Sequence, residues 1–141
     1  MFRKQTFRLC TGSLFFLAIC QAANYLFDPP LICNTGIGFG INIPLFILIP
    51  LTSITLIIAG SFVWKILAST SAPFPFALPG ASILIGGALS NIGERLTRGC
   101  IPDYFLLGWF PAFNMADIGV SIGVIFLAIS ILRNKETGES H

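Results

Sequence analysis

Four long apolar runs dominate the sequence and are separated by short polar, proline-rich or glycine-rich segments. Each run has a length suited to a helix that crosses the roughly 30 Å hydrocarbon core of a bilayer, and they cover approximately residues 9–27, 44–64, 80–96 and 113–132. Asp28, Pro29 and Pro30 end the first run, because proline lacks the amide hydrogen that a helix needs. Residues 34–40, which follow, are rich in glycine and typical of turns or a small sheet. The pattern predicts an all-α membrane protein with four transmembrane helices and a small extracytoplasmic Gly-rich or β segment between helices one and two.

The composition agrees with a single integral membrane domain over residues 1–141. Hydrophobic residues make up 55% of the chain and charged residues 10%, and the mean hydropathy is +0.86. Soluble domains carry about 25% charged residues. The net charge of +2 comes mostly from basic residues near the ends of the runs, so we expect no nucleic-acid partner.

The sequence offers few ligands for a metal or a cofactor. His141 is the single histidine, and the four cysteines show no CxxC spacing. We therefore expect no metal and no cofactor. Cys33 and Cys100 both fall on the predicted outer side, where they could pair, but the sequence does not show whether their thiols meet with disulfide geometry. We therefore interpret the cysteines as buried or idle thiols.

The first run has the features of either a signal peptide or a transmembrane helix, and its length favours the helix. Residues 17–20, Leu-Ala-Ile-Cys, have the outline of a lipoprotein cleavage site. The bulky Ile19 and the three further runs exclude that interpretation.

Basic residues predict the orientation. If the chain crosses the bilayer four times, six of them fall on one side, which predicts that both termini are cytoplasmic: Arg3, Lys4, Arg8, Lys65, Arg133 and Lys135. Arg95 and Arg98 remain outside, against the positive-inside rule. Residues 69–79 read as a short connection with three prolines, and residues 134–141 as a disordered tail.

Small residues in the third and fourth runs predict close helix packing. They are Gly86, Gly87 and Ala88 in the third run, and Gly119 and Gly123 in the fourth.

The stretch from residue 86 to residue 117 holds most of the polar groups that lie at membrane depth. A charged side chain there costs about 2.5 to 3.5 kcal/mol, so such groups are rarely kept unless they are paired, hydrated or functional. The groups are Asn91, Glu94, Arg95, Arg98, Asp103, Asn114 and Asp117. This concentration makes the stretch the candidate site.

Two aspartates in this stretch have the chemistry for peptide hydrolysis without a metal. Asp103 falls just beyond the outer end of the third helix and Asp117 in the first turns of the fourth, so a short loop brings them together. Two adjacent carboxyl groups share one proton, because like charges raise one pKa. The ionised partner then takes a proton from water while the protonated one donates to the scissile carbonyl.

Helical spacing places Asn91, Glu94 and Arg95 on one side of the third helix, and Asn114 and Asp117 on one side of the fourth. The same residues also fit a purely structural interpretation. Glu94 and Arg95 are then interfacial charges, and Asn114 and Asp117 an N-cap and a helix-dipole partner. Spacing alone leaves both interpretations open.

Three motifs resemble those of the lipoprotein signal peptidases, the signal peptidase II family of membrane aspartyl proteases. They are NTGIGFG at residues 34–40, GGALSNIGERLTRGCIPDYF at residues 86–105 and FNMAD at residues 113–117. Their order and spacing match the family pattern over most of the chain. The four-helix topology of the family, with both termini inside, coincides with the one predicted from charge.

The resemblance implies a function and a set of site residues. The catalytic aspartates fall on Asp103 and Asp117, and the substrate-binding or supporting positions on Asn34, Gly36, Asn91, Glu94, Arg95 and Asn114. It implies cleavage of diacylglyceryl-modified prolipoproteins just before the lipidated cysteine, at the extracytoplasmic face of the bacterial inner membrane. Substrate and membrane lipid are the implied partners, and we expect a monomer.

The chain departs from the family pattern in two places. Glu94 stands where the family has aspartate before its arginine, and Cys20 to Asn24 stand where the first helix commonly carries an Asp and Lys pair. No replacement pair is evident in the sequence. The alternative functions are a catalytically silent relative that binds lipidated peptides, a small membrane carrier, and a structural subunit that assembles through Gly119 and Gly123.

Overall fold

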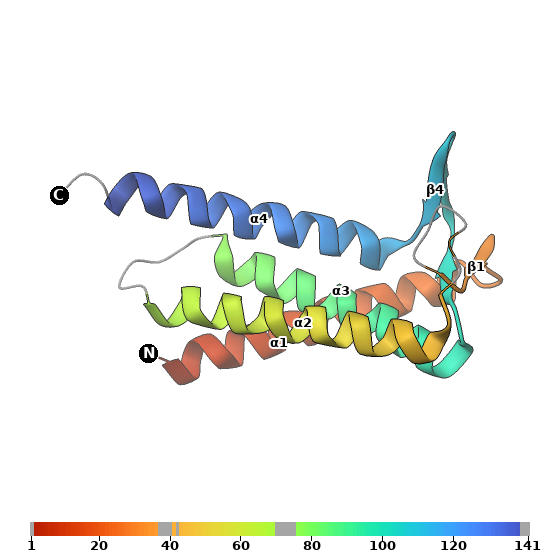
Figure 1. The fold of residues 1–141 in the computed structure, drawn as a ribbon, viewed down its shortest axis with the longest axis horizontal. Helices are drawn as coiled ribbons and strands as arrows, with labels where there is room; N and C mark the ends of the chain where they lie inside the picture. The colour runs from red at the N-terminus through yellow and green to blue at the C-terminus, as the bar shows by residue number, and fades with distance from the viewer. Residues whose placement is uncertain (1, 37–40, 42, 70–75, 139–141) are drawn as a thin grey trace.

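The computed structural model describes residues 2–36, 41, 43–69 and 76–138. Four long helices run side by side in alternating directions (Figure 1): α1 (Phe2–Leu26), α2 (Leu45–Ser69), α3 (Ala77–Arg98) and α4 (Met115–Gly138). Four short strands gather at one end of this bundle: β1 (Ile32–Asn34), β2 (Ile101–Asp103), β3 (Phe105–Leu107) and β4 (Phe110–Phe113). The first turn of α1 and the last turn of α4 lie at the opposite end (Figure 1).

The helices extend beyond the predicted apolar runs. α1 begins at Phe2, because the arginine and lysine residues before the run are themselves good helix formers. α4 continues to Gly138, so the prediction of a disordered tail is wrong for residues 134–138, and residues 139–141 lie outside the described part. α3 begins at Ala77, which places Pro79 in its first turn, where a missing amide hydrogen costs nothing. Residues 70–75 of the predicted connection lie outside the described residues.

Two helices of the described chain are long and apolar enough to cross a membrane, at Arg3–Leu26 and Met115–Arg133. A shorter apolar stretch, Phe46–Ser61, lies within α2. The molecule is thus mostly helical, with an outer surface rich in exposed Phe, Leu and Ile side chains.

α3 is the central helix and packs against the other three. Two adjacent glycines of α3 allow the close approach of α1 and α4. A Cβ atom on Gly86 would lie 2.6 Å from the Ser13 carbonyl oxygen of α1, and one on Gly87 would lie 2.8 Å from the Ala116 carbonyl oxygen of α4. Gly119 likewise faces side chains of α1 and α3, and Gly123 faces the Gly80 carbonyl oxygen and Leu84 of α3, so the predicted close packing is intramolecular.

The strands form two separate antiparallel pairs. The sequence predicts a small β segment only between helices one and two, whereas three of the four strands lie between α3 and α4. β1 does lie between α1 and α2, but its partner is β2, which follows α3; Asn34 pairs with Ile101 and Ile32 with Asp103. β3 and β4 form a hairpin that carries Phe113, so the fourth helix begins at Met115 and not at residue 113. Residues 37–40 of the Gly-rich segment lie outside the described residues.

Candidate active site

Asp103 reaches the site because α3 stops sharply. Gly99 adopts the left-handed conformation, with φ 78°, and its N–H donates to the Arg95 carbonyl, which caps the helix. The chain then enters β2, whose last residue is Asp103. Only 1% of Asp103 is exposed.

Asp117 is fixed by the first turn of α4. Asn114 precedes the helix, and its side-chain oxygen accepts the Asp117 N–H at 3.1 Å, while the Asp117 Oδ2 atom accepts the Asn114 N–H at 3.1 Å. This reciprocal pair is a capping box, which satisfies two N–H groups at the helix end. The N-cap role considered for Asn114 is therefore correct.

The same asparagine also joins the two aspartates. Its Nδ2 donates to Asp103 Oδ1 at 3.0 Å and to Asn91 Oδ1 at 3.4 Å. Asn91 in turn donates to Asp117 Oδ1 at 2.9 Å. Asn114 thus serves the helix cap and the aspartate pair at once, and the two interpretations of this residue are compatible.

β1 supplies a third support. Asn34 donates from Nδ2 to Asp103 Oδ2 at 2.9 Å, and its Oδ1 accepts the Gly36 N–H at 3.0 Å. The Gly36 carbonyl accepts a hydrogen bond from Arg95 Nη2 at 2.9 Å. Arg95 is buried, and its Nε atom has no hydrogen-bond partner, so the interpretation of Arg95 as an interfacial charge is wrong.

Burial raises the pKa of Asp103 from 3.8 to about 6. The hydrogen bond from Asn34 opposes this rise, and the nearby charge of Asp117 adds to it. The Asn114 hydrogen bond and the Arg95 charge lower the pKa again. The surroundings of Asp103 therefore favour its protonated form.

Both aspartates line one cavity of about 350 Å³, together with Asn34, Gly36, Asn91 and Arg95. The structure therefore brings together all of the predicted site residues except Glu94, with Asn114 directly behind the pair. The rest of the wall was missed by the sequence analysis: it consists of Ile101 and the β4 residues Phe110, Pro111, Ala112 and Phe113. The signal for β4 was the apolar and aromatic residues on both sides of Gly108, which is typical of a hairpin.

A second cavity, of about 330 Å³, lies between α2, α3 and α4. Its wall is mostly aliphatic and includes Leu48, Leu84 and Val120, but it also contains Asn91, Arg95 and Asp117. This mostly apolar cavity thus reaches Asp117, one of the two aspartates.

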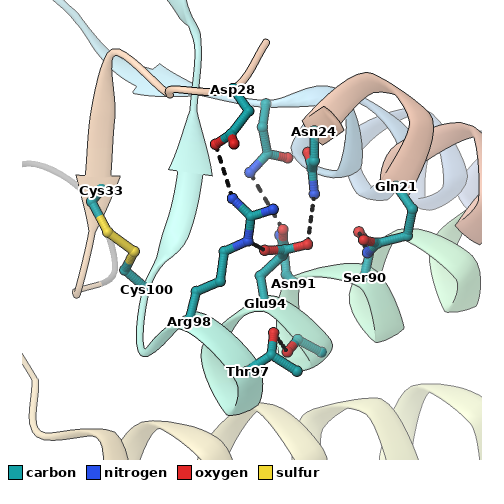
Figure 2. A network of polar contacts seen from close by, with 12 residues as sticks. Gln21, Asn24, Asp28, Cys33, Ser90, Asn91, Glu94, Thr97, Arg98 and Cys100 are labelled. Carbon is teal, nitrogen blue, oxygen red and sulfur yellow. Dashed lines mark hydrogen bonds and ion pairs between the residues drawn. A yellow bond between two sulfur atoms is a disulfide. The ribbon is translucent and has the colours of Figure 1, made fainter. Parts of the chain in front are cut away.

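Glu94 lies on a different side of α3, against α1 (Figure 2). Its Oε1 accepts a hydrogen bond from Asn24 Nδ2 at 3.1 Å, and its Oε2 lies 3.0 Å from Arg98 Nε. The latter contact is an ion pair without hydrogen-bond alignment. Arg98 also pairs with Asp28. Glu94 is therefore buried and not interfacial, and Asn24 is a partner from the first helix that the sequence did not reveal.

Figure 2 also shows the disulfide between Cys33 and Cys100, which joins β1 to the segment that leads from α3 into β2. The interpretation of idle thiols is therefore wrong for Cys33 and Cys100, because the pairing of β1 with β2 brings them together. Cys10 and Cys20 are free. Among the residues that the structure describes, no group of three or more His, Cys, Asp or Glu side chains is placed to hold a metal ion.

Comparison with known proteins identifies the family that the three sequence motifs resemble. The family model described as "Signal peptidase (SPase) II" matches residues 8–133. A lipoprotein signal peptidase of Lactococcus lactis subsp. lactis (strain IL1403) is 40% identical over 89 residues, which are 62% of this chain and 56% of the relative. One from Pseudomonas paraeruginosa (strain DSM 24068 / PA7) is 38% identical over 64 residues, which are 42% of this chain and 38% of the relative. The matches thus span only about two fifths to just over half of these relatives.

Two solved structures share the fold. Both are described as a bacterial membrane enzyme obtained by the in meso method, at 2.3 Å and 1.9 Å resolution. The first has a TM-score of 0.72 at 24% identity and covers 94% of this chain and 92% of the other. The second has a TM-score of 0.62 at 23% identity, with 88% and 92% covered.

Proposed function

Because the chain belongs to the signal peptidase II family, we propose that it is a membrane aspartyl endopeptidase. It cleaves the signal peptide of diacylglyceryl-modified prolipoproteins just before the lipidated cysteine. The observation that carries this proposal is the meeting of Asp103 and Asp117 at one cavity, each hydrogen-bonded to Asn114.

The two aspartates take different roles in the proposed reaction. Asp103 is the acid, because it is the more buried of the two and its raised pKa favours the protonated form. Asp117 accepts the proton of the attacking water, and Asp103 donates its own proton to the scissile carbonyl oxygen. As the tetrahedral intermediate collapses, Asp117 gives the proton that it took from water to the leaving amine, Asp103 takes a proton back from a hydroxyl group of the intermediate, and the peptide bond breaks. Neither step needs a cofactor.

The supporting residues hold this pair in place. Asn34 and Asn114 each donate to a different oxygen of Asp103, and Asn91 donates to Asp117. Arg95 lines the same cavity, and its Nη2 holds the Gly36 carbonyl of the segment that carries Asn34.

The proposed topology has four membrane-spanning helices and both termini in the cytoplasm of a bacterial cell, with the site at the outer face of the inner membrane. The basic ends of α1 and α4 lie at one end of the bundle and the strands at the other (Figure 1). The Cys33–Cys100 disulfide supports an oxidising compartment at the strand end.

The apolar cavity between α2, α3 and α4 suits a lipidated substrate. An acyl chain or apolar signal-peptide segment lies along its aliphatic wall while the peptide bond reaches Asp117. We propose that the protein acts as a monomer and that its partners are the prolipoprotein and membrane lipid, with no nucleic acid involved.

A cleavage assay tests the proposal. Purified protein is mixed with a peptide whose cysteine carries diacylglycerol, and mass spectrometry identifies the cut. We expect wild type to cut just before the cysteine, and Asp103→Asn and Asp117→Asn to cut about 10² to 10⁴ times more slowly. The same peptide without its lipid serves as the substrate control and is cut poorly.

Two results would favour other functions. Wild type that binds the lipidated peptide but cuts no faster than either aspartate variant would favour the catalytically silent relative. Transport of a solute by reconstituted protein without peptide cleavage would favour a carrier. The described site is unlike a transport path, because its ionisable residues Asp103, Asp117 and Arg95 all lie at the strand end of the bundle.

A further inference from the structure

β1 makes few backbone hydrogen bonds that could hold it in place, because it is short and has one partner strand among the described strands. It has three residues, and it pairs only with the equally short β2 among the described strands. Two-stranded pairs of this size are marginally stable in water. Opposite Cys33 stands Pro102, which has no N–H to donate to the ladder. The pairing therefore needs another constraint.

The disulfide supplies that constraint at the central residue of β1. Cys33 is bonded to Cys100, which directly precedes β2, and the two Cα atoms are 5.5 Å apart. The bond spans 67 residues of sequence, so it closes a loop that contains α2 and α3. In the part of the chain that the structure describes, the disulfide is the covalent cross-link between β1 and the segment that carries Asp103.

The residue after Cys33 contacts the aspartate pair directly. Asn34 donates to Asp103 and orients Gly36, whose carbonyl accepts the hydrogen bond from Arg95. A small displacement of β1 would break both links at once. We propose that the Cys33–Cys100 disulfide is a positioning element for the site, which keeps Asn34 bonded to Asp103, and that its reduction by a dithiol converts the protein to a slower form.

The redox step is simple to balance. A dithiol gives two electrons and two protons to the disulfide, through a mixed disulfide, and leaves as its own cyclic disulfide while Cys33 and Cys100 become thiols. No other bond changes. The inference rests on the proposed function for its effect on cleavage, but its effect on Asp103 does not depend on any substrate.

Loss of Asn34 has a defined electrostatic consequence. A hydrogen bond to the charged form of a carboxyl group lowers its pKa, so removing the bond raises it. The other groups that face Asp103 are Asn114, which precedes α4, Asp117 of α4 and Arg95 of α3, and none of them belongs to β1. Reduction therefore acts on Asp103 through Asn34, while the charges of Asp117 and Arg95 remain.

The first experiment measures the pKa of Asp103 without substrate. The carboxyl infrared band of Asp103, identified by difference from Asp103→Asn, is titrated in oxidised protein and in protein treated with dithiothreitol. Alkylation and mass spectrometry verify that Cys33 and Cys100 are reduced. We expect reduction to raise the pKa by about one unit in wild type. In Asn34→Ala, which keeps the disulfide, the pKa is already raised and reduction adds little.

The second experiment measures cleavage of the lipidated peptide. We expect reduction to lower kcat about tenfold and to move the alkaline limb of the pH profile upward by about one unit. Cys33→Ser/Cys100→Ser reproduces the slow form and does not respond to dithiothreitol. Cys10 is a free and exposed cysteine of α1, so Cys10→Ser should behave like wild type and serves as the matched control.

Three results would overturn the inference. They are an unchanged Asp103 pKa in verified reduced protein, an equal response to reduction in wild type and Asn34→Ala, and loss of helical circular dichroism on reduction. The last would show that the disulfide maintains the fold rather than the position of Asn34. Oxidised wild type that cuts no peptide would instead reject the proposed function, and the infrared titration would still decide the inference.

Discussion

The two polar sides of α3 differ in what they face, although their residues are neighbours in sequence. Asn91 and Arg95 face a cavity and the aspartate pair. Ser90 and Glu94 face α1 and are fully packed, with hydrogen bonds from Gln21 and Asn24. The first side leaves room for a ligand, whereas the second side is closed by protein.

This difference separates two reasons for keeping charge in an apolar helix. On the α1 side, Glu94 is joined to a partner helix and to Arg98, which also pairs with Asp28 (Figure 2). Such contacts fix how helices assemble. On the cavity side, the carboxyl groups of Asp103 and Asp117 are held by amide side chains with space in front of them, as a reaction requires. Substitutions on the two sides should therefore affect different measurements.

The largest contrast is expected from one substitution made on both sides. Asn114→Asp retains an N-cap oxygen, but it replaces the amide donor between the two aspartates by a third carboxylate. We expect kcat for the lipidated peptide to fall about 100-fold or more, and the thermal unfolding midpoint to fall as well, because three carboxylates then lie in contact at a buried position.

Asn24→Asp is the matched change on the α1 side, where it places a second carboxylate against Glu94. We expect it to lower the thermal unfolding midpoint and to leave kcat within about twofold, because like charges in contact destabilise the folded state. An active Asn114→Asp together with an inactive Asn24→Asp would reverse the assignment of the two sides.

A smaller contrast is expected from the two arginines, which lie one turn apart. Arg95→Lys loses the planar group that reaches the Gly36 carbonyl and the cavity, and we expect kcat/KM to fall about tenfold. Arg98→Lys keeps a positive charge at a side chain that is 42% exposed, so activity should stay within about twofold. Equal losses in the two variants would show that α3 does not separate the roles in this way.

The smallest effect on activity is expected at Glu94. Glu94→Gln keeps an oxygen that accepts from Asn24 and loses only the ion pair with the partly exposed Arg98, so both activity and stability should change little. Glu94→Leu leaves the buried Asn24 amide unsatisfied and should cost about 1 to 3 kcal/mol in unfolding free energy. Denaturant unfolding in detergent measures both values. A large drop in kcat for Glu94→Gln at unchanged stability would place Glu94 in the site.

The sequence was most informative where spacing and residue type act over short distances. The apolar runs located four helices. The motifs selected candidate site residues, and the structure places six of them at one cavity: Asn34, Gly36, Asn91, Arg95, Asp103 and Asp117. Asn114 illustrates a limit of such reasoning. Its spacing fits either an N-cap or a residue that supports the site, yet its side-chain oxygen does the first and its amide group, by donating to Asp103, does the second.

Glu94 was misplaced for a geometric reason. It is three residues from Asn91, which corresponds to a rotation of about 300° around the helix and leaves the two side chains about 60° apart. That angle is enough to turn Glu94 toward α1 when two helices flank α3. The partner Asn24 is 70 residues distant in sequence, so no local pattern reveals the pair.

The strands were difficult to predict because their pairing is not local. β1 and β2 are separated by two whole helices, and the hairpin of β3 and β4 is short, with Trp109 at its turn 90% exposed. The disulfide depends on the same long-range arrangement. A sequence gives the two cysteines, whereas only the pairing of β1 with β2 brings their Cα atoms to 5.5 Å.

The most direct test of the account is the pH dependence of kcat under conditions where peptide cleavage limits the rate. Asp103 must be protonated, and burial raises its pKa to about 6, so the rate should fall as the pH rises through that value. The fall on the alkaline side follows because ionised Asp103 has no proton to give to the scissile carbonyl. A rate that stays constant from about pH 4 to about pH 8 would contradict the claim that Asp103 and Asp117 hold one proton between them.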